Sequence, residues 1–202
     1  MENDLIFMAM GLAVTGAFAG LVAGLFGIGG GVVMVPALYF AFDLMGYGEG
    51  PRMHVAVGTS LAVIVATSLR SVSAHAKRGA VDFGILKSWT PWIVVGAILG
   101  GALADLTPGR ILTGLFGTMA LVLSAQFVFG RPDWRLAADM PGGLPRAGLG
   151  TGIGVMSSLM GIGGGVFGVT LMTLCGRTIH KAVATAAGFG VAIGLPGAIS
   201  FI

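Results

Sequence analysis

Eight apolar stretches, separated by short polar or Gly/Pro-rich loops, follow one another along the chain. They cover residues 5–26, 32–42, 53–73, 83–104, 111–129, 147–160, 166–175 and 182–202. A helix that crosses a bilayer needs about 20 predominantly apolar residues, and most of these stretches approach that length. The pattern predicts an all-α, polytopic membrane protein.

Two copies of one glycine-rich hexapeptide, GIGGGV, interrupt the apolar pattern at residues 27–32 and 161–166. The first lies in an uncharged run over residues 5–42, which as one helix would be about 57 Å long at ~1.5 Å per residue. The hydrocarbon core is about 30 Å thick, so this run has to break, and the glycines are the obvious place. The stretches 32–42 and 147–160 are too short to cross, so we expect glycine-broken half-helices or re-entrant hairpins.

Basic residues gather in three of the loops, and cytoplasmic loops are enriched in lysine and arginine. If loops 75–82, 131–146 and 176–181 are cytoplasmic, that side of the membrane holds Arg70, Lys77, Arg78, Lys87, Arg131, Arg135, Arg146, Arg177 and Lys181. The other side holds only Arg52 and Arg110. The distribution predicts a multi-pass protein of the cell (inner) membrane with its N-terminus outside.

With this orientation the two glycine segments enter the membrane from opposite faces, which indicates an inverted repeat. A second pair of similar blocks follows the glycine motifs: HVAVGTS at residues 54–60 and HKAVATA at residues 180–186. We expect a first transmembrane repeat over residues 1–130, a cytoplasmic linker over 131–146 and a second repeat over 147–202. The second repeat is expected to be incomplete, because it lacks counterparts of the last two helices of the first.

The paired breaks are the candidate substrate site, because breaks of this kind usually meet near the bilayer midplane. Half-helix N-termini carry partial positive charge and free amides, which suit an anion. We therefore expect substrate contacts from the backbone amides of six glycines and from four hydroxyl side chains. These residues are Gly29, Gly30, Gly31, Gly163, Gly164, Gly165, Thr59, Ser60, Thr185 and Ser158.

Each of these residues also has a simpler interpretation. Hydroxyls in membrane helices often bond their own backbone, and this applies to Ser157 as well as to Ser158. Glycines outside the motifs are expected to serve close helix packing. Those glycines are Gly20, Gly24, Gly96, Gly100 and Gly101. A dinucleotide-binding loop is disfavoured, because no alternating strand and helix unit precedes either motif.

Two histidines, His54 and His180, occupy equivalent places at helix entrances. We expect an interfacial role first, with a proton relay as the alternative. An intramembrane enzyme would need a nucleophile and a base, for which Ser157 and His180 are candidates. No G-x-S-x-G elbow supports such a pair, so the sequence does not predict an enzyme.

Composition agrees with the membrane interpretation, since 55% of the residues are hydrophobic, 9% are charged and the mean hydropathy is +0.96. The single cysteine, Cys175, excludes an intramolecular disulfide, and no cysteine or histidine cluster has zinc spacing. No metal or other cofactor is predicted. The formal charge of +3 includes no basic tract of the kind that binds nucleic acid.

Four features together resemble the sulfite exporter TauE/SafE family of membrane transporters. They are the first glycine motif with Pro36, the block AVGTS at residues 56–60, the turn at residues 75–82, and the second glycine motif with KAVAT at residues 181–185. The resemblance implies a multi-pass transporter, often an exporter, of small sulfur-containing or organic anions such as sulfite and sulfonates. We expect alternating access, with an anion channel as the alternative. The expected partners are a small anion, the lipid bilayer and a second copy in a homodimer.

Overall fold

Seven helices make up the described part of the computed structural model, which covers residues 30–46, 48–129 and 139–201 and the separate positions 13, 16, 17, 20, 21 and 137. The helices are α2 (Gly31–Leu44), α3 (Glu49–Lys77), α4 (Phe83–Asp105), α5 (Gly109–Phe129), α6 (Gly143–Met160), α7 (Gly165–Leu174) and α8 (Ile179–Ser200). No strand occurs within these residues, so the predicted all-α class is confirmed. Most of the expected stretch 5–26, and the glycines 27–29, lie outside the described residues.

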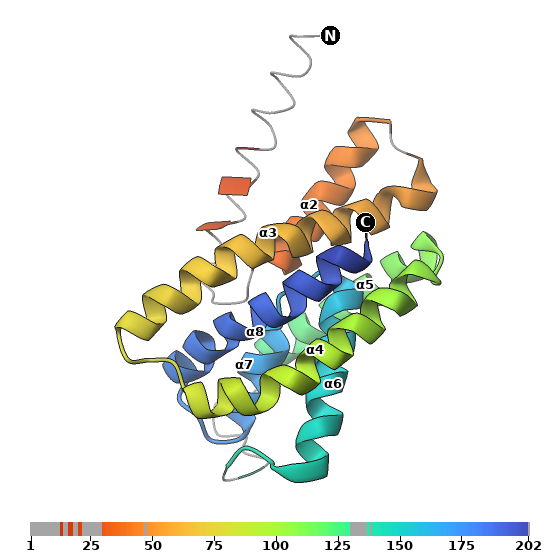
Figure 1. Ribbon diagram of the computed structural model, residues 1–202. Helices are drawn as coiled ribbons and strands as arrows, with labels where there is room; N and C mark the ends of the chain where they lie inside the picture. The colour runs from red at the N-terminus through yellow and green to blue at the C-terminus, as the bar shows by residue number, and fades with distance from the viewer. Residues whose placement is uncertain are drawn as a thin grey trace.

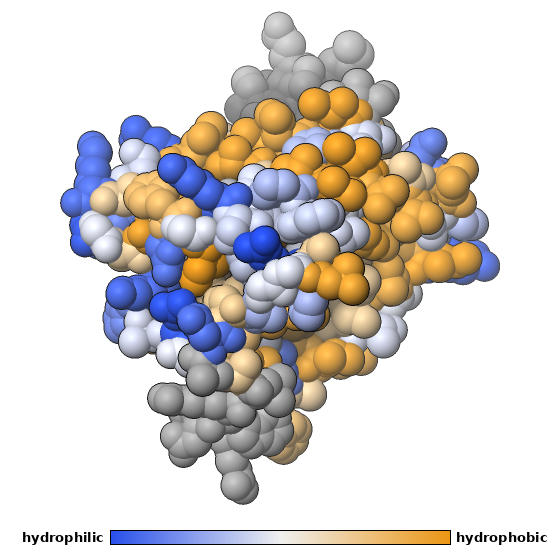
Figure 2. Space-filling model, turned by 60° about the horizontal axis from the view of Figure 1, so that its bottom comes forward, coloured by the Kyte–Doolittle hydropathy of each residue, from blue (hydrophilic) through white to orange (hydrophobic). Residues whose placement is uncertain are grey.

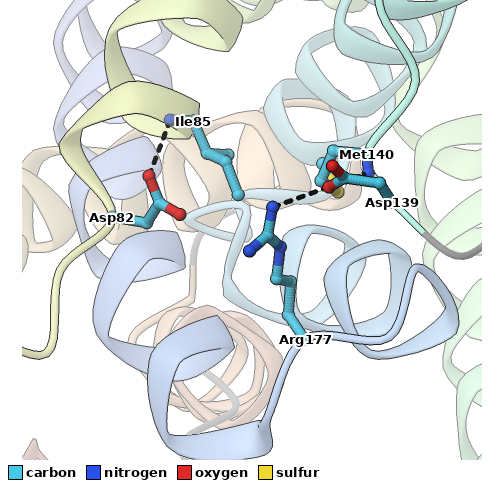
Figure 3. Close-up of polar contacts among 5 residues, drawn as sticks. All are labelled: Asp82, Ile85, Asp139, Met140 and Arg177. Carbon is cyan, nitrogen blue, oxygen red and sulfur yellow. Dashed lines mark hydrogen bonds and ion pairs between the residues drawn. The ribbon is translucent and has the colours of Figure 1, made fainter.

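Local chemistry sets where several helices begin and end. The Asp82 side chain accepts a hydrogen bond from the backbone N–H of Ile85 at 3.0 Å and so caps the start of α4 (Figure 3). Gly79, with φ +64°, follows the end of α3, and Gly161, with φ +67°, ends α6. A residue with a Cβ is strained in this left-handed region, which explains glycine at both positions.

Three of the described helices, α3, α4 and α8, are long and apolar enough to cross a membrane. The helices α2 and α7 are apolar but shorter, and α2 covers the stretch 32–42 that was expected to be too short. The stretch 147–160 was expected to be short as well, but α6 has 18 residues because it begins at Gly143, before the apolar stretch. Large hydrophobic side chains of α5 face outward, with Leu121 73% and Val128 71% exposed. An outer surface of this kind fits contact with lipid. The expected polytopic membrane fold is therefore confirmed.

The helices α3, α8 and α4 form one layer, with α8 between the other two (Figure 1). The chain runs along α3 and α8 in opposite directions (Figure 1). Each of these two helices follows a glycine motif and a short helix in the sequence. The order of motif, short helix and long helix thus occurs twice in the sequence, and the two long helices run in opposite directions.

The helices α4 and α6 pack backbone to backbone through glycine. A Cβ at Gly96 would collide with the carbonyl oxygen of Thr151, and a Cβ at Gly154 would collide with that of Ile93. A Cβ at Gly100 would likewise collide with the carbonyl oxygen of Val155. The predicted packing role is confirmed for three glycines of α4. Gly96 and Gly100 pack on α6, and Gly101 packs on Ser200 of α8.

Gly20 lines a cavity, and a Cβ at this position would meet no described atom within 4 Å. Its packing role stays a prediction. Gly24 lies outside the described residues.

Two interactions bring the predicted cytoplasmic loops to one end of the bundle. The hydroxyl of Thr185, near the start of α8, accepts a hydrogen bond of 2.9 Å from the backbone N–H of Asp82. Arg177 forms an ion pair of 2.6 Å with Asp139 (Figure 3). Figure 2, which brings this end forward, shows hydrophilic groups gathered across it, with hydrophobic surface above them and to their right.

The carboxyl group of Asp139 is held in its charged form by its surroundings. The backbone N–H of Met140 donates to it at 2.7 Å, and this bond, together with the Arg177 guanidinium, keeps the pKa of Asp139 below its ordinary value of 3.8. A lowered pKa means that the ion pair persists at neutral pH and is lost only as the pH falls through that lowered value. The link between the two loops is therefore stable across the physiological range.

The opposite end of the bundle is joined by other contacts. The Nε2 atom of His54 lies 3.0 Å from the carbonyl oxygens of both Ala104 and Thr107, so it links the start of α3 to the end of α4. Arg52 forms an ion pair of 2.6 Å with Asp43 at the end of α2. Arg52 thus lies at the end opposite the basic loops, as the distribution of basic residues along the sequence predicted.

Gly96→Leu tests the close contact between α4 and α6. The new side chain would enter space filled by the backbone of Thr151, so we expect a loss of about 1–3 kcal/mol in stability. Thermal unfolding in detergent measures the effect. Gly114→Leu on α5 is the matched control, because a Cβ at Gly114 meets nothing within 4 Å and should leave the midpoint unchanged.

Candidate functional site

The two glycine motifs meet inside the protein. Gly31 packs so closely on Gly161 and Ile162 that a Cβ at Gly31 would overlap the carbonyl oxygen of Gly161. Gly161 in turn packs on Val35 of α2 and on the backbone of Val57 in α3. Side chains larger than hydrogen would push the two breaks apart, so the glycines permit this approach.

Two backbone N–H groups at the second break pair with carbonyls of the break and of the last turn of α6. The N–H of Ile162 donates to the carbonyl of Ser157 at 2.9 Å, and the N–H of Gly164 donates to that of Ile162 at 2.8 Å. The hydroxyl of Ser60 in α3 donates to the carbonyl of Gly161 at 2.9 Å. The break is therefore anchored to α3 by a side chain as well as by packing.

A cavity of about 460 Å³ lies beside the breaks. Gly30 of the first motif and Gly163 and Gly165 of the second all line it. One face of α3 forms the longest described wall, through Val63, Ile64, Thr67, Ser68, Ser71 and His75. Residues 183, 186 and 187 of α8 also contribute to the lining. The volume falls within the range of about 300–1,000 Å³ that is typical of ligand pockets.

Two helix N-termini reach this cavity. Gly30 is the N-cap residue of α2, and Gly165 is the first residue of α7. At neither N-terminus does a described side chain make a capping hydrogen bond. The first amides of a helix lack intrahelical partners and carry partial positive charge, so this wall favours an anion.

The described lining of the cavity contains no carboxylate, and His75 is its one titratable side chain. The remaining polar groups among these lining residues are the hydroxyls of Thr67, Ser68 and Ser71. All of these groups can form hydrogen bonds, and none of them carries a negative charge. The electrostatic character of the wall therefore suits a negative ligand.

The structure brings together half of the glycines predicted to bind substrate. Gly30, Gly163 and Gly165 line the cavity, whereas Gly31 packs on the second break. Gly164, with φ +68°, packs on Ile193 and Phe189 of α8 and is not part of the described lining. Gly29 lies outside the described residues. Substrate contact by these amides stays a prediction.

The four predicted hydroxyls lie away from the described cavity lining. Ser60 bonds to the carbonyl of Gly161, and Thr185 bonds to the N–H of Asp82. Ser158 is fully buried near Gly100 and Gly197, and neither its hydroxyl nor that of Ser157 has a hydrogen-bond partner in the described structure. Thr59 is half-buried. Their roles in binding substrate stay predictions.

The histidines His54 and His180 also lie away from the cavity lining. His54 joins α3 to α4 through two backbone carbonyls, and His180 is exposed in the first turn of α8. Both positions are at ends of the bundle, as an interfacial role requires. The alternative of a proton relay is not tested by this arrangement.

Sequence reasoning missed the polar side chains of α3 that line the cavity. Ser68, Ser71 and His75 are three and four residues apart, a spacing that places them on one helix face. That spacing was available from the sequence. What the sequence did not show is that this face borders a cavity rather than another helix.

Ser60→Ala tests how the second break is anchored. The change leaves the buried carbonyl of Gly161 without its side-chain donor, so we expect a loss of about 1–3 kcal/mol in stability. Thermal unfolding in detergent measures the effect. A variant as stable as the parent protein would show that the hydrogen bond contributes nothing to the position of the break.

These features define a polytopic helical membrane protein in which Gly31 of the first glycine motif packs on Gly161 of the second, where the chain leaves helical geometry. The sulfite exporter TauE/SafE family matches residues 12–202, and the chain belongs to this family. The resemblance predicted from the four motifs is confirmed. The family consists of membrane transporters rather than enzymes, so the prediction that this chain is not an enzyme is confirmed as well.

Two relatives of similar sequence cover most of the chain. A probable membrane transporter protein of Haemophilus influenzae is 33% identical over 189 residues, which are 94% of this chain and 72% of the relative. A probable membrane transporter protein of Methanocaldococcus jannaschii is 29% identical over 209 residues, covering 100% of this chain and 75% of the relative. No solved structure gives a significant match. The chain is therefore a membrane transporter by family.

Proposed function

We propose that this protein transports a small sulfur-containing or organic anion, such as sulfite or a sulfonate, through the cavity beside the two glycine breaks. The observation that carries the proposal is that Gly30, Gly163 and Gly165, from motifs far apart in the sequence, line one cavity. Uncapped helix N-termini at two of these glycines supply donors for an anion. The family supports export as the direction of transport.

The size of the cavity supports a range of anions. At about 30 Å³ per water molecule, 460 Å³ holds ~15 waters. The space therefore accepts an oxyanion together with hydration water or with a short organic group. Sulfite and small sulfonates both meet this condition.

Alternating access is supported by the arrangement of the helices. The helices α3 and α8 follow equivalent motifs and run in opposite directions, as an inverted repeat requires (Figure 1). We propose repeats over residues 1–130 and 147–202, with the linker 131–146 on the cytoplasmic side of the inner membrane and the N-terminus outside. A homodimer is part of the same proposal.

The position of the cavity lining along α3 supports a carrier. The lining residues of α3 lie between Val63 and His75, in the half that ends at the basic loops. The other half of α3 contains several buried residues. These are Arg52, Met53, Ala56, Val57, Ser60 and Leu61. A site lined from one half of a long helix supports one state of alternating access.

Gly30→Leu tests the proposed site. Gly30 has helical φ and ψ, and a Cβ there meets no described atom within 4 Å, so the side chain can extend into the cavity without disturbing the fold. We expect uptake of radiolabelled sulfite or sulfoacetate into proteoliposomes to fall at least about tenfold, the effect of 1.4 kcal/mol of lost binding.

Gly117→Leu on α5 is the matched control, because this exposed glycine also has no described neighbour within 4 Å of a Cβ. We expect its uptake to equal that of the parent protein. Unchanged uptake by a folded Gly30→Leu protein would contradict the proposed site. Uptake that does not accumulate the anion against its own electrochemical gradient would favour the channel.

A further inference from the structure

Three polar side chains line the cavity along one face of α3. Ser68 lies next to the second break, where it packs on the backbone of Gly190, a residue that also packs on Gly163. Ser71 lies about one turn further along the helix, and His75 about one turn beyond Ser71. The three form a row that starts at the break and follows the wall of the cavity.

The side chains in this row are free of the hydrogen bonds that occupy other hydroxyls. Eight other hydroxyls donate to helix carbonyl groups three or four residues earlier in the chain, the usual arrangement for serine and threonine in a membrane helix. They are those of Thr67, Ser88, Thr90, Thr107, Thr113, Thr118, Thr173 and Ser200. Ser68, Ser71 and His75 make no side-chain hydrogen bond to any described residue.

The row leads from the breaks to the basic end of the bundle. From Ser68 to His75 the helix rises about 10 Å at ~1.5 Å per residue. This is about a third of a hydrocarbon core of about 30 Å. The row therefore leads from the level of the second break toward the basic end of the bundle.

Positive charge lies where the row approaches this surface. Arg70 and Lys77 line a shallow outer groove, and Ser71 is part of both that groove and the cavity. Neither lining contains a carboxylate among the described residues. An anion that reaches this end meets attractive charges first and uncharged donors next.

We propose that Ser68, Ser71 and His75 form the inner arm of the substrate path, a row of hydrogen-bond donors for an oxyanion between the glycine breaks and the basic end of the bundle. The inference rests on the proposed transport of anions and names the side chains that carry the anion to and from the breaks. Their O–H and N–H groups replace water around the anion, which a wall of valine and alanine cannot do.

Uptake kinetics give the first test. Hydrogen bonds to charged groups are worth a factor of about 10 to 100 each, so Ser68→Ala combined with Ser71→Ala is expected to raise KM for the anion at least tenfold. His75→Leu is expected to act in the same way, whereas His75→Gln, which keeps an N–H donor, retains most of the transport. Thr118→Ala is the control, because its exposed hydroxyl bonds its own backbone.

Thiol labelling tests the row without relying on transport. Cys175 is the single cysteine of the chain and is buried, so a Cys175→Ser background allows one new cysteine at a time. Ser68→Cys, Ser71→Cys and His75→Cys are labelled with a water-soluble maleimide in reconstituted membranes, with and without sulfoacetate. Thr178→Cys is the control, because Thr178 is exposed at the same end of the bundle but is not part of the cavity lining.

We expect sulfoacetate to slow labelling at least about tenfold at the three row positions and to leave Thr178→Cys unchanged. Equal labelling rates with and without sulfoacetate at all three positions would overturn the row as an anion path, as would failure of all three to react. Uptake by the parent protein is measured in parallel. If sulfoacetate slows labelling but the parent protein shows no uptake, the row binds the anion and the proposed transport is contradicted. If the parent protein shows uptake but sulfoacetate does not slow labelling, transport is supported and the row is contradicted.

Discussion

Backbone polar groups inside a bilayer must find partners within the protein, because the hydrocarbon offers none. At the second glycine motif the chain leaves helical geometry at Gly161 and resumes it at Gly165. The N–H of Ile162 and the N–H of Gly164 pair with carbonyls of the break, and Ser60 pairs with the carbonyl of Gly161. The break is possible in a membrane because these bonds replace water.

The same pairing fixes the position of the candidate site. Ser60 ties the second break to α3, and Gly31 packs on that break from α2. A residue at the start of each of two helices, α2 and α7, thereby lines one cavity, whose described lining contains no carboxylate. The proposed preference for an anion rests on backbone geometry rather than on a buried cationic side chain, which would be costly in the bilayer.

Much of the fold could be predicted from the sequence, because apolar stretches and glycine breaks are local features. The prediction placed a helix over residues 83–104, and α4 spans Phe83–Asp105. The close packing of Gly96 and Gly100 was also predictable, since small residues recur where membrane helices touch. The repeated motif was enough to single out Gly30, Gly163 and Gly165, which line the cavity.

The parts that sequence reasoning missed depend on how helices are rotated against one another. Ser68, Ser71 and His75 have a regular spacing, but the spacing does not say whether their face meets a helix, lipid or a cavity. The hydrogen bond that the Thr185 hydroxyl accepts from the N–H of Asp82 was not predicted either, because it joins two segments far apart in the sequence. Tertiary contacts decide both outcomes, and a single sequence does not contain them.

A structure determined with bound selenite, the heavier analogue of sulfite, would test the central claim most directly, because the anomalous signal of selenium locates the anion. The account predicts one strong peak in the cavity beside Gly30, Gly163 and Gly165, within about 3 Å of backbone amides at a helix N-terminus. An ordered anion bound elsewhere in the membrane region, with the cavity empty at saturating selenite, would contradict it.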